Sequence, residues 1–355
     1  MQTEFYKISR TPLGVRFFCI NLFLISMIGL GCESSSGPVT VKFSGQTMGT
    51  TYSVSISNLP DGTTSEILQE GVSRVLVEVN QQMSNWIDDS EISRFNRLES
   101  TDWFEVSPET AKVIAESIRI SQDSKGAFDV TVAPLIDAWG FGPVGREVDP
   151  PDEQQLERLK AIIGSEKLAS RTEPAAIKKT DAEVTVNLSA IAKGAGVDAV
   201  AEYLESQGVT AYLVEIGGEI RVAGLKPNGE KWRVGIERPN ETGRSLQNAV
   251  SLTDQAMATS GDYRNFIEYE GKKYSHTIDP RELKPITHEL ASVTVLAANC
   301  LQADAWATAL MVMGPANGYD WAEDRGMAVL MLIHAGDGFE ERATTTWKQQ
   351  IGEKP

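Results

Sequence analysis

The sequence predicts an α+β fold in which helices pack on a largely antiparallel sheet. Short alternating runs fill the second half and are joined by turn dipeptides such as Asn228-Gly229 and Glu270-Gly271, which favour hairpins. Helical patterns interrupt these runs at few places, whereas a doubly wound parallel sheet would alternate strand and helix throughout. Between Val39 and Ile351 the sequence shows neither a Pro/Ser-rich linker nor an internal repeat. We therefore expect one domain over residues 39–351.

The first 31 residues have the features of a bacterial secretory signal. Three basic residues precede an apolar run over 17–30, which is too short to cross a bilayer comfortably. The run ends at Gly31-Cys32 and is similar to the lipobox of bacterial lipoproteins, except that Gly29 stands where an aliphatic residue is usual. We predict cleavage before Cys32, lipidation of Cys32 and a flexible tether over residues 32–38. Cleavage without lipidation is the alternative.

Elements of the first half follow from local patterns. Residues 39–57 alternate like strands on either side of Met48-Gly49, and apolar residues at helical spacing predict a helix over Ser65–Met83. Further along, the sequence predicts a helix that begins at Ser107-Pro108 and ends near Gly126, a short strand over Phe128–Val132, and a helix over Asp152–Ile163.

The second half is richer in strands. Two helices interrupt them, over Ala190–Ser206 and Leu301–Met313. Strands are predicted over Val184–Leu188, Ala211–Ile216, Glu219–Leu225, Lys231–Glu237, Tyr263–Tyr269, Lys273–Ile278, Val293–Ala297 and Met327–Ile333.

Charge and cysteine content exclude several classes of function. The chain carries 49 acidic and 33 basic side chains, with a net charge of −16, so we expect no nucleic-acid partner. Of its three cysteines, Cys19 would leave with the signal and Cys32 would carry lipid, which leaves Cys300 alone. A disulfide within the mature chain and a zinc site with several cysteines are then excluded.

Two glycine-rich segments do not match nucleotide-binding motifs. Gly194-Ala195-Gly196 lacks the third glycine of a dinucleotide fingerprint and a βαβ frame. The segment 224–229 has the length of a P-loop but is followed by Glu230-Lys231-Trp232, so a hairpin around Asn228-Gly229 explains it better.

Other motifs carry chemistry but are individually weak. Asp304 and Thr308 lie four apart on a predicted helix and present hard oxygen donors suited to Mg²⁺, although helix capping and packing explain them equally well. His276 lies at the end of a predicted strand, where a histidine serves as general base, phosphate ligand or structural residue. Phe128, Trp86 and Met48 fit a flavin pocket or a hydrophobic core.

Taken together and in order, the motifs resemble the ApbE family over about residues 40–350. They are Thr47-Met48-Gly49-Thr50, Met83-Ser84 to Ser93-Arg94-Phe95-Asn96, Gly126-Ala127-Phe128-Asp129, Trp139-Gly140-Phe141-Gly142, Asn187-Leu188-Ser189-Ala190-Ile191-Ala192-Lys193-Gly194, Ile216-Gly217-Gly218-Glu219-Ile220, Ala258-Thr259-Ser260-Gly261-Asp262-Tyr263, Ser275-His276-Thr277-Ile278-Asp279-Pro280 and Ala303-Asp304-Ala305-Trp306-Ala307-Thr308-Ala309.

The resemblance implies an Mg²⁺-dependent FAD:protein FMN transferase with an ApbE-type, T-fold-like single domain. Such enzymes cleave FAD at its pyrophosphate, attach FMN through a phosphoester to a Ser or Thr of a target flavoprotein, and release AMP. Typical targets are subunits of the Na⁺-translocating NADH:quinone reductase and of the Rnf complex, which carry a Ser/Thr-Gly-Ala-Thr-like segment. The resemblance also implies a lipoprotein that faces the periplasm, anchored to the inner or outer membrane.

The same resemblance assigns site residues by position. It implies a metal site at the carbonyl of Ala190 with Asp304 and Thr308, and it implies His276 as the catalytic residue, either as general base or as phosphate ligand. The implied flavin pocket is Met48, Trp86, Ala127, Phe128, Asp129, Asn187, Lys193 and Ile278. This sequence departs from the family pattern at Trp86, Asn187 and Ala195, where Tyr, Asp and an aromatic residue are common. An FAD pyrophosphatase and a non-enzymatic flavin-binding lipoprotein remain the alternatives.

Overall fold

The computed structural model describes residues 40–141, 150–239, 246–261, 266–269, 272–336 and 338–352. The chain divides into two compact units, Met1–Gly37 and Pro38–Pro355, and only the second contains described residues. The predicted signal, the tether and the lipidation site at Cys32 lie outside the described residues, as does the Glu270-Gly271 turn. Within the described part of the chain, no helix is both long and apolar enough to span a membrane.

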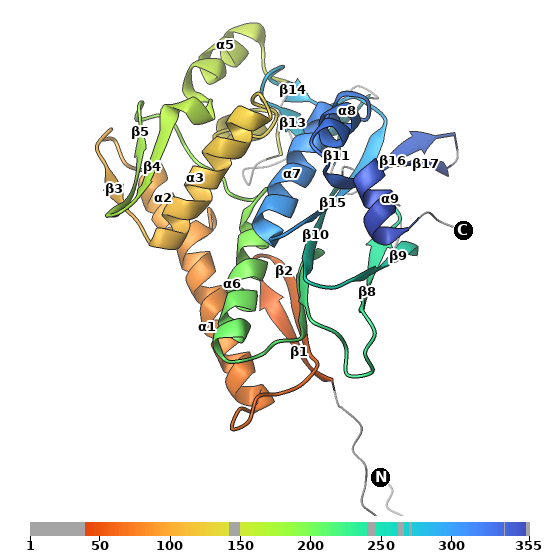
Figure 1. Cartoon of the computed structure of the whole chain (residues 1–355). Helices are drawn as coiled ribbons and strands as arrows, with labels where there is room; N and C mark the ends of the chain where they lie inside the picture. The colour runs from red at the N-terminus through yellow and green to blue at the C-terminus, as the bar shows by residue number, and fades with distance from the viewer. Residues whose placement is uncertain are drawn as a thin grey trace, which may run out of the picture. The chain divides into compact units, whose positions relative to one another are not determined.

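An eight-stranded sheet forms the centre of the second unit (Figure 1). Every neighbouring pair in it is antiparallel, which confirms the predicted fold class. In sheet order the strands are β1 (Val41–Thr47), β2 (Thr50–Ile56), β6 (Tyr212–Ile216), β7 (Glu219–Ala223), β10 (Gln255–Gly261), β15 (Leu290–Ala297), β16 (Ala328–Ala335) and β17 (Gly338–Ala343).

Three long helices cover one face of this sheet: α1 (Ser65–Met83), α6 (Ala192–Ser206) and α7 (Cys300–Met313). The opposite face is covered over β7, β10, β15 and β16 by a hairpin of β8 (Trp232–Glu237) and β9 (Leu246–Leu252), with α9 (Thr345–Ile351) beside it. The side chains of β7 alternate between the two faces of the sheet. Glu219 and Arg221 contact α6 on one face, whereas Ile220 and Val222 pack under the β8–β9 hairpin on the other.

Smaller elements surround the two layers. A three-stranded sheet, β3 (Phe104–Glu105), β5 (Ala175–Lys179) and β4 (Leu168–Thr172), packs on α3 (Pro108–Asp123). Two short pairs, β11 (Phe266–Tyr269) with β12 (Lys272–Ser275) and β13 (Ile278–Asp279) with β14 (Lys284–Pro285), complete the strands. The remaining helices are α2 (Glu91–Asn96), α4 (Ala133–Ala138), α5 (Glu153–Ile162), the 3₁₀ turn η1 (Ser165–Lys167) and α8 (Asn317–Asp324).

Helix starts agree with the sequence because short polar side chains cap them. Thr64, Ser107 and Asp152 accept backbone N–H bonds at the first turns of α1, α3 and α5, and α1 has the predicted bounds.

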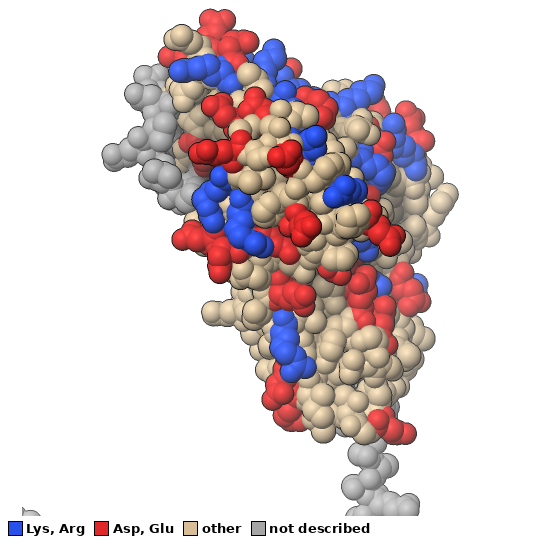
Figure 2. All heavy atoms as spheres, turned by 90° about the vertical axis from the view of Figure 1, so that its left-hand side faces the viewer, with Lys and Arg blue, Asp and Glu red and all other residues tan. Residues whose placement is uncertain are grey.

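On the face shown in Figure 2, side chains of both charge signs are interspersed.

Two strand predictions and one hairpin prediction were wrong. Phe128–Val132 forms turns because Asp129 Oδ1 accepts bonds from the amide and hydroxyl of Thr131, and Val184–Leu188 is extended but pairs with no described strand. The turn at Asn228-Gly229 joins β7 to β8, which belong to different sheets, so it is not a hairpin.

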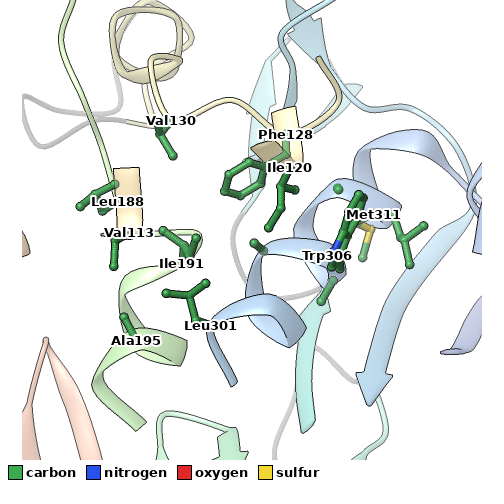
Figure 3. Close-up of a cluster of buried hydrophobic side chains, with 14 of the residues drawn as sticks. Val113, Ile120, Phe128, Val130, Leu188, Ile191, Ala195, Leu301, Trp306 and Met311 are labelled. Carbon is green, nitrogen blue, oxygen red and sulfur yellow. The ribbon is translucent and has the colours of Figure 1, made fainter. Parts of the chain in front are cut away.

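The largest hydrophobic cluster lies where α6 and α7 meet the 127–130 segment. Figure 3 shows Phe128 and Ile191 pointing into it, with Leu301 and Trp306 from α7. The ring of Phe128 is 1% exposed, so this core holds the segment in place.

Candidate active site

A cleft of about 400 Å³ opens between α6, α7, the end of β10 and the 127–129 and 276–280 segments. It brings together residues that lie up to 185 positions apart (Ala127 to Val312) in the sequence. Its walls include most of the predicted site residues, namely Ala127, Phe128, Asp129, Ala190, Lys193, His276, Ile278, Asp304 and Thr308.

Helices α6 and α7 run antiparallel, and each holds the first turn of the other. Asp198 on α6 accepts N–H bonds from Cys300 (3.0 Å) and Leu301 (2.8 Å) at the start of α7. In return, Asp304 Oδ2 on α7 accepts the N–H of Gly194 (2.9 Å) at the start of α6. A Cβ on Gly194 would lie 2.4 Å from the carbonyl oxygen of Cys300, so glycine permits this close approach.

The bond from Gly194 to Asp304 has a consequence for Ala190. In a regular α-helix the amide of residue 194 would donate to the carbonyl of residue 190. Here that amide donates to Asp304, and no backbone amide of the described residues donates to the carbonyl of Ala190. The Ala190 carbonyl is therefore available as a ligand at the cleft wall, beside Asp304.

The oxygen atoms around Asp304 form a hard donor set. Thr308 is one turn along α7, and its Oγ1 lies 3.2 Å from Ser260 Oγ on β10. Burial raises the pKa of the Asp304 carboxyl, which is 4% exposed. Clusters of three or more His, Cys, Asp or Glu side chains are absent from the described residues, so a metal here would rest on one carboxylate with carbonyl and hydroxyl oxygens. Mg²⁺ tolerates such a site, since it retains waters and binds phosphate oxygens.

Glu219 is a site residue that the sequence analysis did not assign. Its Oε1 lies 2.6 Å from Lys193 Nζ, and its Oε2 is buried without a hydrogen-bond partner among the described residues. Burial raises the pKa of Glu219 to about 8, although the charge of Lys193 opposes this. For Lys193, burial lowers the pKa, but the charges of Asp304 and Glu219 outweigh it and hold the pKa above its usual value. The feature of the sequence that could have identified Glu219 is its position as an acidic residue directly after Gly217-Gly218.

Met48 and Trp86 line an adjoining cavity of about 150 Å³, which shares Ser189 and Lys193 with the cleft. Met48 occupies the β1–β2 turn with φ +49°, followed by Gly49 at +71°. A long side chain in this left-handed region is strained, and such strain gathers at functional sites. Trp86 is 76% exposed, which leaves its ring accessible to a ligand.

Asp129 and Asn187 have structural partners. Besides Thr131, the Asp129 carboxylate accepts bonds from the amide and hydroxyl of Ser165, both at 2.9 Å, and burial raises its pKa. Asn187 Oδ1 accepts the amide of Ser189 (2.9 Å) and the residue does not line the cleft. Both side chains fix loops that border the cleft.

His276 lies between β12 and β13, and both His276 and Ile278 line the cleft. The carboxylate of the nearby Asp279 accepts bonds from the amide (2.9 Å), Nε (2.9 Å) and Nη2 (2.7 Å) of Arg281, and Asp279 does not line the cleft.

Comparisons with known proteins show the family of this chain. The ApbE family model matches residues 48–331. The chain is 46% identical over 318 residues to the FAD:protein FMN transferase of Vibrio cholerae, spanning 90% of this chain and 94% of that protein. It is 35% identical over 337 residues to the enzyme of the same name from Escherichia coli K12, spanning 92% and 95%.

Solved structures give the same result. The flavin transferase ApbE from Vibrio cholerae matches with a TM-score of 0.80 and 45% identity, over 88% of this chain and 99% of that one. The apo form of the Pseudomonas stutzeri flavinyl transferase ApbE matches with a TM-score of 0.81 and 36% identity, over 89% and 98%.

Proposed function

Because the chain belongs to the ApbE family, we propose that this transferase moves the FMN moiety of FAD to a Ser or Thr hydroxyl of a target flavoprotein and releases AMP. One observation carries the proposal. The oxygen donors of Ala190, Asp304 and Thr308 line the same cleft as the cation of Lys193 and the imidazole of His276. A diphosphate needs such a combination, since phosphoryl transfer depends on positioning and charge neutralisation.

Mg²⁺ fits the donors of this cleft. The Ala190 carbonyl, the Asp304 carboxylate and the Thr308 hydroxyl would hold it. Glu219 Oε2, which has no hydrogen-bond partner among the described residues, would accept a bond from one of its waters. When bound, the ion supplies positive charge against the diphosphate. The charged groups of the cleft also favour a bound cation, because the two buried acidic side chains of Asp304 and Glu219 face a single ammonium, that of Lys193.

The remaining roles belong to side chains around the two cavities. Lys193, shared by both, would contact the diphosphate, while Met48 and Trp86 would pack against the flavin ring. His276, which lines the cleft, would accept the proton of the incoming hydroxyl. The hydroxyl oxygen forms a bond to the FMN phosphorus, and the bond from that phosphorus to the bridging oxygen breaks, so that AMP leaves.

Acceptors with a Ser/Thr-Gly-Ala-Thr-like segment, on subunits of Na⁺-translocating NADH:quinone reductase or Rnf type, are the targets that we propose. We also propose that Cys32 is lipidated and that the domain faces the periplasm from a bacterial membrane, on the strength of the signal-like residues 1–31. Labelling with a palmitate analogue should mark the wild-type chain but not Cys32→Ala.

The test of the activity uses FAD, Mg²⁺ and a soluble acceptor domain that carries the Ser/Thr-Gly-Ala-Thr-like segment. We expect FMN attached to one Thr, seen by mass spectrometry, with AMP released in equal amount. Asp304→Asn retains the shape of the side chain and an acceptor for Gly194 but loses the charge, so turnover should fall at least ~100-fold while FAD binding persists.

The matched control is Asp324→Asn, which removes an exposed carboxylate at the end of α8 and should retain full activity. Release of free FMN and AMP without any protein adduct would overturn the transfer in favour of a pyrophosphatase.

A further inference from the structure

A second hollow, a groove of about 570 Å³, adjoins the cleft on the opposite face of the central sheet. The groove and the cleft share the walls formed by Lys193, Glu219, Thr259, Gly261 and His276. Lys193, which we propose contacts the diphosphate, and His276, which we propose accepts the proton of the incoming hydroxyl, are therefore both reachable from the groove.

The groove and the cleft are connected because neighbouring strands of the sheet end at different positions. The last pair between β7 and β10 is Ile220 with Met257, so Thr259–Gly261 of β10 extend past the end of β7. The β6–β7 turn ends the neighbouring strands at Gly217 and Gly218, whose φ angles are +62° and +110°. The sheet is thus open at this end, where the helix side meets the groove side.

The floor of the groove is the part of the sheet that the β8–β9 hairpin leaves uncovered. Ser53 on β2 and Glu215 on β6 are register partners there, joined by a hydrogen bond of 3.2 Å. Leu213 lies beside them, only partly buried. Alternation places these side chains opposite Val54, Val214 and Ile216, which pack under α1 and α6.

The wall of the groove is the edge of β8. Arg233 and Gly235 are exposed and Val234 is buried, yet all three line the groove, which requires that the strand present its edge. Among the described residues, β8 pairs with β9 on its other side and with no further strand. Unpaired backbone groups along this edge offer hydrogen bonds to an incoming extended chain.

We propose that the acceptor protein docks here, with an extended segment alongside β8 that delivers its Ser or Thr hydroxyl through the open end of the sheet to His276. The proposal rests on the transferase function proposed above, which needs a macromolecular hydroxyl to reach a diphosphate held on the helix side. In this proposal FAD occupies the cleft and its adjoining cavity and leaves the groove to the acceptor.

The test compares two substitutions on the same face of one hairpin. Gly235 on β8 and Ala249 on β9 are register partners and both are exposed, but only Gly235 lines the groove, whereas Ala249 lines a separate hollow. Gly235→Leu should raise the KM for the acceptor domain at least ~10-fold. Ala249→Leu should leave it within ~2-fold.

Two further measurements separate docking from other effects. Slow cleavage of FAD in the absence of acceptor, and the KM for FAD, should remain within ~2-fold of wild type in both variants. Arg233→Glu, an exposed change on the same edge, should weaken acceptor use in the same direction and guards against misfolding of Gly235→Leu. Equal acceptor KM values for wild type, Gly235→Leu and Arg233→Glu would overturn the docking site while leaving the transferase function intact. Failure of the wild-type chain to attach FMN would overturn both.

Discussion

At the scale of single residues, Lys193 determines the charge of the site. Its ammonium lies against Glu219, which is 2% exposed, and its field reaches the buried Asp304. Glu219 depends on Lys193 more than Lys193 depends on Glu219, because the lysine side chain is 32% exposed and retains some water. The two partners should therefore respond differently to substitution.

We expect Lys193→Met to lower the free energy of unfolding by about 2 kcal/mol, since it leaves a buried carboxyl without its cation. Glu219→Gln should cost less than about 1 kcal/mol, and the double variant should recover part of the lysine loss. Urea unfolding of the four proteins measures this. Equal losses in the two single variants would contradict the asymmetry.

His288 gives the stability a pH dependence. Its Nε2 is buried without a partner among the described residues, and its Nδ1 accepts the amide of Leu290. Burial lowers the pKa of His288 below its usual 6.5, although nearby backbone carbonyls and Asp279 oppose this. The unfolded chain then binds the proton first as pH falls, so this contribution to stability is complete above pH 6.5 and is lost as pH falls below it.

The matched comparison is His288→Gln against His334→Gln, which changes an exposed imidazole. Between pH 7.5 and 5.5 the melting temperature of His288→Gln should fall less than that of wild type, while His334→Gln should follow wild type. The same pH slope in all three proteins would remove His288 as the cause.

At the scale of elements, the antiparallel pair of α6 and α7 positions the residues of the proposed metal site. Asp198 and Asp304 each bind the first turn of the opposite helix, and the bond to Gly194 leaves the Ala190 carbonyl without its helical partner. A mutually capped pair of this kind places a carboxylate and a carbonyl side by side without a cluster of acidic residues. The helix spacing is therefore part of the site.

Gly194→Ala should test that spacing. The added Cβ would meet the Cys300 carbonyl at 2.4 Å, a rigid backbone atom, so we expect a loss of about 3 kcal/mol in unfolding free energy. The control is Gly196→Ala on the same helix, where the nearest atom is the flexible end of Met48 at 2.7 Å and the loss should stay within about 1 kcal/mol. Similar denaturation midpoints for the two variants would contradict this account.

At the scale of the whole molecule, non-covalent interactions stabilise the described part of the chain, in which no disulfide is present. Cys300 is its one cysteine among the described residues, and it is fully buried with a pKa well above its usual value, chiefly through burial. The sequence predicted an unpaired thiol at this position. The eight-stranded sheet and its two covering layers thus hold together through hydrophobic cores on both faces.

We expect the Cys300 thiol to react only when the domain opens. In a chain with Cys19→Ser and Cys32→Ser, modification by a thiol reagent should be at least ~1,000-fold slower in native buffer than in urea. Reducing agent should leave the melting temperature unchanged. Rapid labelling in native buffer would show that α7 opens locally.

Several elements could be predicted because their signals are local. The bounds of α1 follow from apolar spacing and the cap at Thr64, and the i, i+4 spacing on α7 was enough to pair Asp304 with Thr308. β10 was missed, although Gln255–Gly261 lies between β7 and β15 in the sheet. Its short polar sequence carries no periodic signal, and its position depends on strands far away in the chain.

The sequence by itself determined the helix limits and caps, the single available thiol, the donor types at the proposed metal site and the membership of a family. These depend on residue type or on interactions within a few residues. Only the tertiary structure decided the strand order, the bond that leaves the Ala190 carbonyl available, the pairing of Lys193 with Glu219, and the open end of the sheet. Those features arise from contacts between segments remote in sequence, which no local pattern encodes.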